Sequence, residues 1–209
     1  GSPYWEPPNT IGWEALPFPS GKQYISEMER LLATIHRVSA DALSLPDSDY
    51  FISYYKSPNG NALRLSNYPK QEVFPEAGQY RYGAHVDYGG FTLLLQDPTD
   101  GVGMGGLEVQ DPKSKRWLTV LPRKGRDGEE AYTVNVGDLW QRWTNDLWHA
   151  NNHRVGNPTK STGARLALVF FSGPRADALI EPLPGHGKSK YPPATAGDLL
   201  QEKLQRSNL

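Results

Sequence analysis

The first regular pattern of apolar and polar positions in the chain is helical. From Ser20 onward, apolar residues recur at steps of three and four, the spacing that places them on one face of an α-helix. Ser20 and Gln23 form the capping-box pattern of a helix start, and Pro46 follows the expected end. The sequence predicts a helix over 20–45, with His36 at the solvent edge of the apolar stripe. The members of the stripe are Tyr24, Met28, Leu31, Leu32, Ile35, Val38 and Ala42.

Beyond this helix the pattern changes to a period of two, which is typical of β-strands. In the stretch NALRLSNYP, Leu63 and Leu65 lie on one face of the expected strand. Arg64, Ser66 and Tyr68 lie on the opposite face. Further short runs follow between glycines, Asp-Pro pairs and charged loops, among them FTLLLQD, GLEVQD, RWLTVLP, AYTVNVGD and ARLALVFF. Many short strands after one helix predict a mainly β fold, an antiparallel jelly roll of two sheets.

The length and the order of these segments predict a single domain. A chain of 209 residues can bury a sizeable core. Residues 1–19 are rich in proline and aromatic residues without a period, and we expect an irregular arm there. The jelly-roll core is expected over 61–174. A tail over 175–209 ends in a second helix, whose start shows the capping pair Thr195 and Asp198.

Composition narrows the classes of function. The formal net charge of -1 gives no electrostatic reason to expect binding to nucleic acid or to an anionic membrane surface. No apolar run reaches membrane-spanning length, so we expect a soluble, intracellular and cytoplasmic protein. The chain begins Gly-Ser-Pro without methionine, which leaves room for an upstream targeting peptide. Because the chain has no cysteine, any metal must be bound by histidine, carboxylate, carbonyl or water.

A candidate metal site begins with a histidine and an aspartate two positions apart. His85 and Asp87 lie between glycines, just before the apolar run FTLLLQD. In a strand, side chains two positions apart share a face and are separated by roughly 6–7 Å of backbone. Both side chains can therefore reach one metal ion, although a lone His-x-Asp pair is a weak signal.

A third ligand is expected from the segment LWHANNHRVGNP, which contains His149 and His153. The two other histidines are poor candidates, because His36 is on the helix and His186 is in a tail rich in glycine and proline. Two histidines and one aspartate on a rigid sheet form the facial triad of non-haem iron sites, which leaves three coordination positions open. Zinc accepts the same ligands, so the triad alone does not identify the metal.

The run ARLALVFF places an arginine among apolar residues. Arg165 alternates in phase with Ala167, Val169 and Phe171, so it shares their face of the strand. A buried guanidinium group requires an anionic partner, since an uncompensated buried charge is costly. A bound carboxylate ligand fits the planar fork of arginine, and an internal salt bridge to Asp or Glu is the alternative.

Several motifs occur in the order seen in one enzyme family. They are LRLSNYP, YGAHVDYGGFTLLLQD, GGLEVQD, TVNVGDLWQRWTND, HRV and RLALVFF. Through them the chain resembles the isopenicillin N synthase-like, iron(II)- and 2-oxoglutarate-dependent oxygenases, most closely over 63–174. The resemblance implies a distorted double-stranded β-helix in which His85, Asp87 and His153 bind iron(II). It also selects His153 over His149 as the distal ligand.

The resemblance further implies a co-substrate site and an activity. Arg165 is expected to bind the far carboxylate of 2-oxoglutarate, with Tyr68 and Ser66 beside it. The implied reaction uses O2 to oxidise a C–H bond of a small molecule, with release of succinate and CO2. Hydroxylation, desaturation and oxidative cyclisation are all open, and an amino-acid derivative or a secondary metabolite is the expected kind of substrate. The candidate substrate contacts are Tyr88, Phe91, Asn151 and Phe171, for which packing or a turn is the alternative role.

The chain also departs from the family pattern. The usual Arg-x-Ser reads Arg165-Leu166-Ala167, so one hydroxyl donor to the co-substrate is missing. That departure keeps open an iron(II) oxidase of the same fold that uses no 2-oxoglutarate and binds a substrate carboxylate at Arg165. A non-catalytic or zinc-loaded jelly-roll binding domain is the alternative from another class. The N-terminal region of the family is expected to be missing before Gly1.

Overall fold

A computed structural model describes most of the chain. The residues that it describes are 19–70, 75–76, 78–96, 106–158, 164–185 and 187–207. Of the arm predicted over 1–19, residues 1–18 therefore lie outside them, and Pro19 belongs to the first helix. They fall into two compact units. The helical unit comprises 1–61, 173–180 and 193–209, and the barrel unit comprises 62–172 and 181–192. The prediction of one domain stays a prediction.

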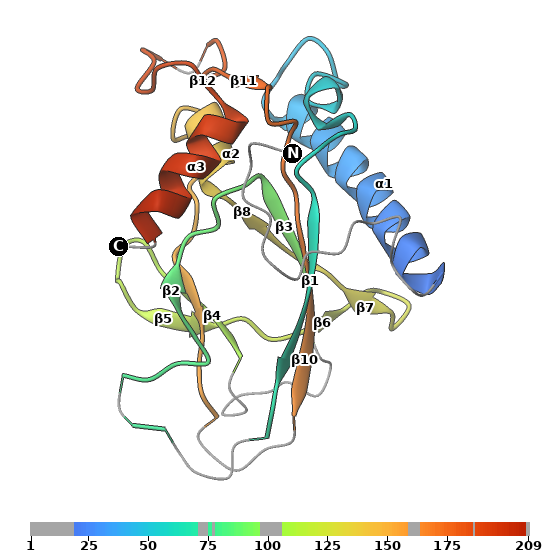
Figure 1. Ribbon diagram of the computed structural model, residues 1–209, viewed down its shortest axis with the longest axis vertical. Helices are drawn as coiled ribbons and strands as arrows, with labels where there is room; N and C mark the ends of the chain where they lie inside the picture. The colour runs from blue at the N-terminus through green and yellow to red at the C-terminus, as the bar shows by residue number, and fades with distance from the viewer. Residues whose placement is uncertain are drawn as a thin grey trace. The chain divides into compact units, whose positions relative to one another are not determined.

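The helical unit contains the long helix expected near the start of the chain. Its elements are α1 (Pro19–Ala42), the 3-10 helix η2 (Ile52–Tyr55), the short antiparallel pair β11 (Leu179–Ile180) and β12 (Ala194–Thr195), and α3 (Ala196–Ser207) (Figure 1). The start of α3 is capped as expected, because the Asp198 N–H donates to Oγ1 of Thr195 at 3.1 Å. None of the helices over the described ranges has the length and apolar character needed to cross a membrane.

The position of His36 at the solvent edge of α1 was wrong. Its side chain is only 1% exposed, and its ring lies 4.1 Å from that of Tyr55 between centroids. Steps of three and four from Met28 lead through Leu32 to His36, whereas Val38 lies on the other side of the helix and is 62% exposed. Burial lowers the pKa of His36 to about 3, so the imidazole is neutral at pH 7.

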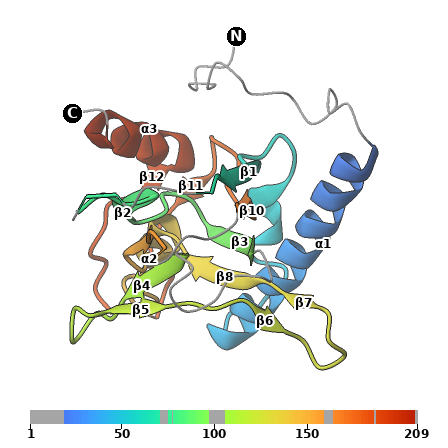
Figure 2. The same ribbon diagram turned by 90° about the horizontal axis from the view of Figure 1, so that it is seen from below.

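The barrel unit consists of two antiparallel four-stranded sheets, as the strand pattern predicted (Figures 1 and 2). The first has the order β1-β10-β3-β8 and the second β2-β9-β4-β5. The strands of the first are β1 (Ala62–Tyr68), β10 (Arg165–Phe171), β3 (Phe91–Gln96) and β8 (Thr133–Val136). Those of the second are β2 (Tyr82–His85), β9 (His153–Val155), β4 (Leu107–Gln110) and β5 (Trp117–Thr119). The hairpin β6 (Arg123–Lys124) and β7 (Glu130–Ala131) and the helix α2 (Asp138–Trp143) complete the elements.

The register of the first sheet places the polar face of β1 toward a cavity. Arg64, Ser66 and Tyr68 line this cavity, which confirms the predicted phase of the strand. Residues of β2, β4 and β9 line it as well, so it lies between the two sheets. Successive inward pairs of β1 and β10 are Arg64 with Val169, Ser66 with Ala167, and Tyr68 with Arg165.

A close backbone contact holds the turn that follows β2. The Gly137 N–H donates to the Gly90 carbonyl at 2.8 Å, and the Asp138 N–H donates to the Asp87 carbonyl at 2.8 Å. A Cβ atom added to Gly137 would lie 2.6 Å from the Gly90 carbonyl oxygen and closer still to that of Gly89. Since these neighbours are backbone atoms, only glycine fits at position 137 without movement of the turn that contains Asp87.

The substitution Gly137→Ala tests this contact. We expect it to lower the free energy of unfolding by about 1–3 kcal/mol, because the methyl group overpacks a rigid backbone. Urea unfolding measures the change. Gly83→Ala is the matched control, since a Cβ atom there meets no atom within 4 Å, and it should leave the stability nearly unchanged. Equal stability of the two variants would contradict the steric argument.

Candidate metal centre

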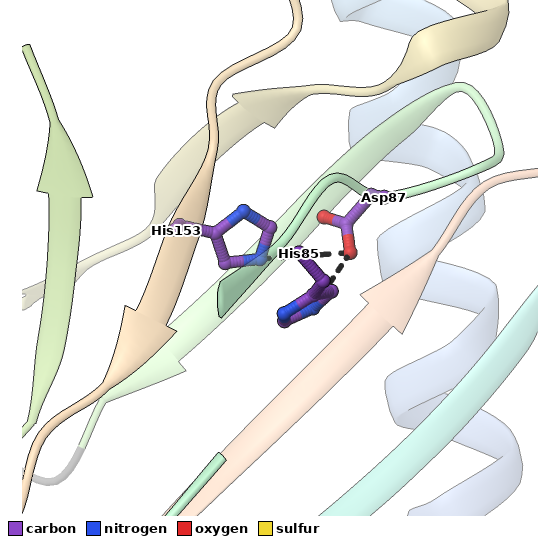
Figure 3. A group of neighbouring side chains, drawn as sticks. All are labelled: His85, Asp87 and His153. Atoms are coloured by element: carbon purple, nitrogen blue, oxygen red, sulfur yellow. Dashed lines mark ion pairs between the residues drawn. The ribbon is translucent and has the colours of Figure 1, made fainter. Parts of the chain in front are cut away.

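Three side chains of the barrel unit converge as a possible metal site (Figure 3). One ligand atom from each of His85, Asp87 and His153 lies within 4.8 Å of the others. Nε2 of each histidine is 3.6 Å from Oδ1 of Asp87. Ligands that meet a transition metal at about 2.0–2.2 Å and near right angles lie roughly 3 Å apart. The group therefore needs only a small contraction to hold one ion.

Strand pairing positions the two histidines. His85 ends β2, His153 begins β9, and the two are direct partners in the register of these antiparallel strands. Their ring centroids are 4.2 Å apart. Asp87 lies in the turn after β2 rather than on the strand, and the hydrogen bond from Asp138 N–H holds its backbone. Sequence spacing predicted that His85 and Asp87 share one face of a strand. The structure brings the two side chains together through the turn after β2, because the strand itself ends at His85.

Backbone carbonyls determine the tautomer of both histidines. Nδ1 of His85 is 2.9 Å from the Gly83 carbonyl, and Nδ1 of His153 is 3.1 Å from the Asn151 carbonyl. A carbonyl oxygen can only accept a hydrogen bond, so each Nδ1 carries the proton. In the neutral form of each ring, Nε2 is then the nitrogen that carries the lone pair, and it lies toward Asp87, where a metal ligand must be.

Only one oxygen of Asp87 is available to a metal. Its Oδ2 accepts hydrogen bonds from Oγ1 of Thr92 at 2.7 Å and from Nδ2 of Asn135 at 2.8 Å. Its Oδ1 faces the two histidines. The carboxylate is therefore arranged to bind through one atom, which leaves three positions of an octahedral ion open rather than two.

The surroundings of Asp87 favour its ionised form. Burial alone raises the pKa of this carboxyl, whose side chain is 6% exposed. The hydrogen bond with His85, the charge interaction with His153 and the donors Thr92 and Asn135 outweigh burial and lower the pKa to about 2. Two imidazoles and one ionised carboxylate are the donor set of a facial triad.

The metal ligands form one side of a cavity of about 500 Å³ between the two sheets. This volume is in the range of small-molecule sites. Arg165 lines the same cavity, is 4% exposed, and has its guanidinium carbon 4.9 Å from the centre of the Tyr68 ring. Within the described part of the barrel unit, Asp87 is the only carboxylate among the lining residues.

The structure brings together some of the other predicted residues and separates others. Ser66, Asn151 and Phe171 line the cavity with Tyr68 and Arg165. Tyr88 and Phe91 do not line it. Phe91 instead packs in an aromatic cluster, with its ring centroid 4.3 Å from that of Trp140. This places Phe91 in the core rather than at the substrate, the alternative noted for it above.

Of the two histidines in LWHANNHRVGNP, the structure places only His153 in the triad. His149 is exposed and lies outside the group of ligands. His186 lies outside the described residues.

Sequence reasoning overlooked two residues of the site, Thr92 and Asn135. Each is a polar residue at an inward position of an apolar run, in FTLLLQD and in AYTVNVGD. The two residues are direct cross-strand partners of each other in the register of β3 and β8. A polar residue at an inward position of an apolar strand could have marked each of them as a site residue. Spacing along the chain did not reveal that both side chains would reach Asp87.

Comparison with known proteins identifies a family. The family described as the 2OG-Fe(II) oxygenase superfamily matches residues 52–174. A curated relative is the 2-oxoglutarate-Fe(II) type oxidoreductase hxnY of Emericella nidulans, 36% identical over 171 residues. The match covers 79% of this chain and 46% of that protein. The chain thus spans about half the length of such relatives.

Solved structures agree with the family match. A full-length Neurospora crassa protein in complex with alpha-KG and thymine superimposes with a TM-score of 0.78 and 32% identity, over 93% of this chain and 58% of that chain. JOX2 in complex with 2OG, Fe and JA superimposes with a TM-score of 0.72 and 27% identity, over 97% of this chain and 57% of that chain. The predicted double-stranded β-helix is confirmed by these likenesses and by the two sheets of the barrel unit.

The two donors to Asp87 yield a prediction for metal affinity. We expect Asn135→Ala and Thr92→Val each to weaken iron(II) binding roughly 10–100-fold, because partners that orient a ligand contribute effects of this size. Anaerobic titration against a chelator measures the affinity. Asn151→Ala is the matched control, since only its backbone carbonyl contacts His153 and the substitution retains that group. If all three variants bound iron equally, the orienting role of the two donors would be wrong.

Proposed function

The chain belongs to the 2OG-Fe(II) oxygenase superfamily, and from this premise we propose that it is an iron(II)- and 2-oxoglutarate-dependent dioxygenase acting on a small molecule. One observation carries the proposal. The Nε2 atoms of two histidines and a single aspartate oxygen meet at one wall of a cavity that also contains the buried arginine Arg165. Such a cavity can hold a chelating dicarboxylate between a metal and a cation.

The proposed reaction is balanced by its co-substrates. With iron(II) bound, 2-oxoglutarate loses CO2 and becomes succinate, one oxygen atom of O2 enters the succinate, and the other oxidises the substrate C–H bond. The residues of this chain hold the reactants. His85, Asp87 and His153 would hold the ion through one ligand atom each, which would leave coordination positions for the co-substrate and O2.

Arg165 is the proposed partner of the far carboxylate of 2-oxoglutarate. Its burial suits a partner with which it makes paired, charge-assisted hydrogen bonds, the geometry in which arginine binds carboxylates. The Tyr68 ring against its guanidinium restricts its orientation. A co-substrate bound between Arg165 and the metal would span the cavity along β10.

Ser66 offers a hydroxyl that replaces the missing family serine. Position 167 is alanine here, and Ala167 is the direct cross-strand partner of Ser66. Both residues line the cavity. Directly opposed residues of antiparallel strands have Cβ atoms about 4.5–5.5 Å apart, so a hydroxyl on β1 can reach the space that one on β10 would occupy.

The first experiment requires no substrate. The metal-free protein is loaded anaerobically with iron(II), 2-oxoglutarate is added, and the visible metal-to-ligand charge-transfer band is titrated. We expect a saturable band in the natural chain and a Kd for 2-oxoglutarate raised at least tenfold in Arg165→Gln, since loss of a buried charge partner costs roughly 2–5 kcal/mol. Arg126→Gln, an exposed arginine outside the cavity, is the control.

The outcomes separate the alternatives. Iron binding without a band at high 2-oxoglutarate would overturn the proposal and favour an oxidase that binds a substrate carboxylate at Arg165. Tightly bound zinc without O2 consumption would favour a binding domain. A band that Arg165→Gln leaves unchanged would place the far carboxylate elsewhere.

The hydroxyl exchange is tested by rescue. We expect Ser66→Ala to weaken 2-oxoglutarate binding roughly 3–10-fold, the effect of one hydrogen bond. Adding Ala167→Ser should restore the affinity, because the new hydroxyl arises on the same rung of the sheet. Adding Ala167→Cys in place of Ala167→Ser is the control of similar size, and the thiol should not rescue, since it is a weak donor. If Ala167→Ser and Ala167→Cys both restored the affinity, or if neither did, the proposal that a hydroxyl at position 66 replaces one at position 167 would be wrong.

A further inference from the structure

A second arginine faces the cavity at a different place from Arg165. Arg64 lies on the inner face of β1, four residues before Tyr68, the cross-strand partner of Arg165. Four residues of extended strand separate these positions by roughly 13 Å of backbone. The two arginines therefore originate well apart along the wall of the same cavity.

The surroundings of Arg64 are apolar. Its partner on β10 is Val169, whose own partner on β3 is Leu94, and all three line the cavity. The guanidinium carbon of Arg64 is 5.3 Å from the centre of the Phe171 ring. Over the residues that the structure describes, no acidic side chain pairs with Arg64. The side chain of Arg64 is exposed and therefore accessible to a ligand. A solvated arginine needs no partner, but this one faces a cavity wall made of Val, Leu and Phe.

The aromatic contact of Arg64 leads toward the metal ligands. Phe171 is the cross-strand partner of Thr92, whose hydroxyl donates to Oδ2 of Asp87. The ring in contact with the Arg64 guanidinium thus lies on the same rung of the sheet as Thr92, the residue that orients the metal ligand. A molecule anchored at Arg64 and lying along Phe171 would extend toward the open coordination positions.

We propose that Arg64 anchors a carboxylate of the primary substrate, and that the substrate is an acid with an apolar body. The apolar lining available to that body consists of Leu94, Leu107, Val109, Val155, Val169 and Phe171. This inference rests on the proposed function, since it assigns Arg165 to 2-oxoglutarate and so leaves Arg64 for the substrate.

The charges of the cavity support an anionic substrate. The described lining residues include three arginines, Arg64, Arg81 and Arg165, against the single carboxylate of Asp87. A substrate carboxylate at Arg64 would make a charge-assisted contact, and in a partly desolvated cavity that interaction is stronger than in water.

Pairs of probes that differ only in charge test the proposal. The 209-residue protein is loaded with nickel(II), with and without saturating 2-oxoglutarate, and binding is measured by calorimetry. The probes are 3-phenylpropanoate with 3-phenylpropanamide and octanoate with octanamide. We expect each carboxylate to bind at least roughly tenfold more tightly than its amide, the effect of charge-assisted hydrogen bonds to a guanidinium.

Variants then locate the anchor. Arg64→Gln should abolish the preference for the carboxylate, Arg64→Lys should retain part of it, and the control Arg126→Gln should retain all of it. The charge-transfer titration of the same variants should show the 2-oxoglutarate affinity of Arg64→Gln changed by less than about twofold, because Arg165 holds the co-substrate. Circular dichroism and the midpoint of thermal unfolding check that each variant folds.

Two different failures are distinguishable. If the natural chain gives no charge-transfer band, the proposed function fails, and the probe comparison without 2-oxoglutarate still tests Arg64. If the band forms but neither carboxylate binds better than its amide, the anchor proposal is overturned. A preference that survives Arg64→Gln and is lost in Arg165→Gln would overturn it as well, and would place the substrate carboxylate at Arg165.

Discussion

The pair of hydrogen bonds on Oδ2 of Asp87 is the constraint on which the candidate metal centre depends. A carboxylate with two free oxygens can bind a metal through both, but Thr92 and Asn135 occupy one of them. The remaining oxygen faces two imidazoles whose tautomers are determined by backbone carbonyls. The chain therefore presents three ligand atoms on one side of a site. The other side stays open because the hydrogen bonds of Oδ2 keep this atom of Asp87 from acting as a fourth ligand.

The backbone around this centre is as constrained as its side chains. The turn after β2 carries Asp87, and its close contact with Gly137 leaves no space for a Cβ atom. The same contact brings the N–H of Asp138, the first residue of α2, to the Asp87 carbonyl. The start of a helix and the end of a strand thus hold the metal-ligand turn from both sides, so that small changes in either element would be felt at the metal.

The two sheets contribute different residues to the cavity. The second sheet supplies the histidines through the direct pairing of β2 with β9, and the first supplies the two arginines Arg64 and Arg165. Within the first sheet, the register separates Arg64 from Arg165 by four residues of strand. One extended wall can therefore offer two cationic positions to two different anions without either arginine competing for the same group.

The sequence by itself determined the strand phases, because a period of two is set by the geometry of the strand alone. Alternation grouped Ser66 with Tyr68 on one face of a strand, and the structure turns that face toward the cavity. The order of motifs indicated the family and selected His153 over His149, and the structure groups His153 with His85 and Asp87. For α1, periodicity predicted the helix but assigned His36 and Val38 to the wrong faces. The prediction assumed that apolar residues are buried and polar residues exposed, and these two residues are the reverse.

Contacts between distant segments were beyond the reach of the sequence. Thr92 and Asn135 meet at one oxygen of Asp87 because β3 pairs with β8 in one particular register, and no spacing along the chain encodes a cross-strand register. The same is true of Ser66 opposite Ala167. It is also true of Phe91, a candidate substrate contact by its place in the sequence, which the structure packs against Trp140. Local sequence set which face each side chain occupies, and only the tertiary structure decided which side chains share it.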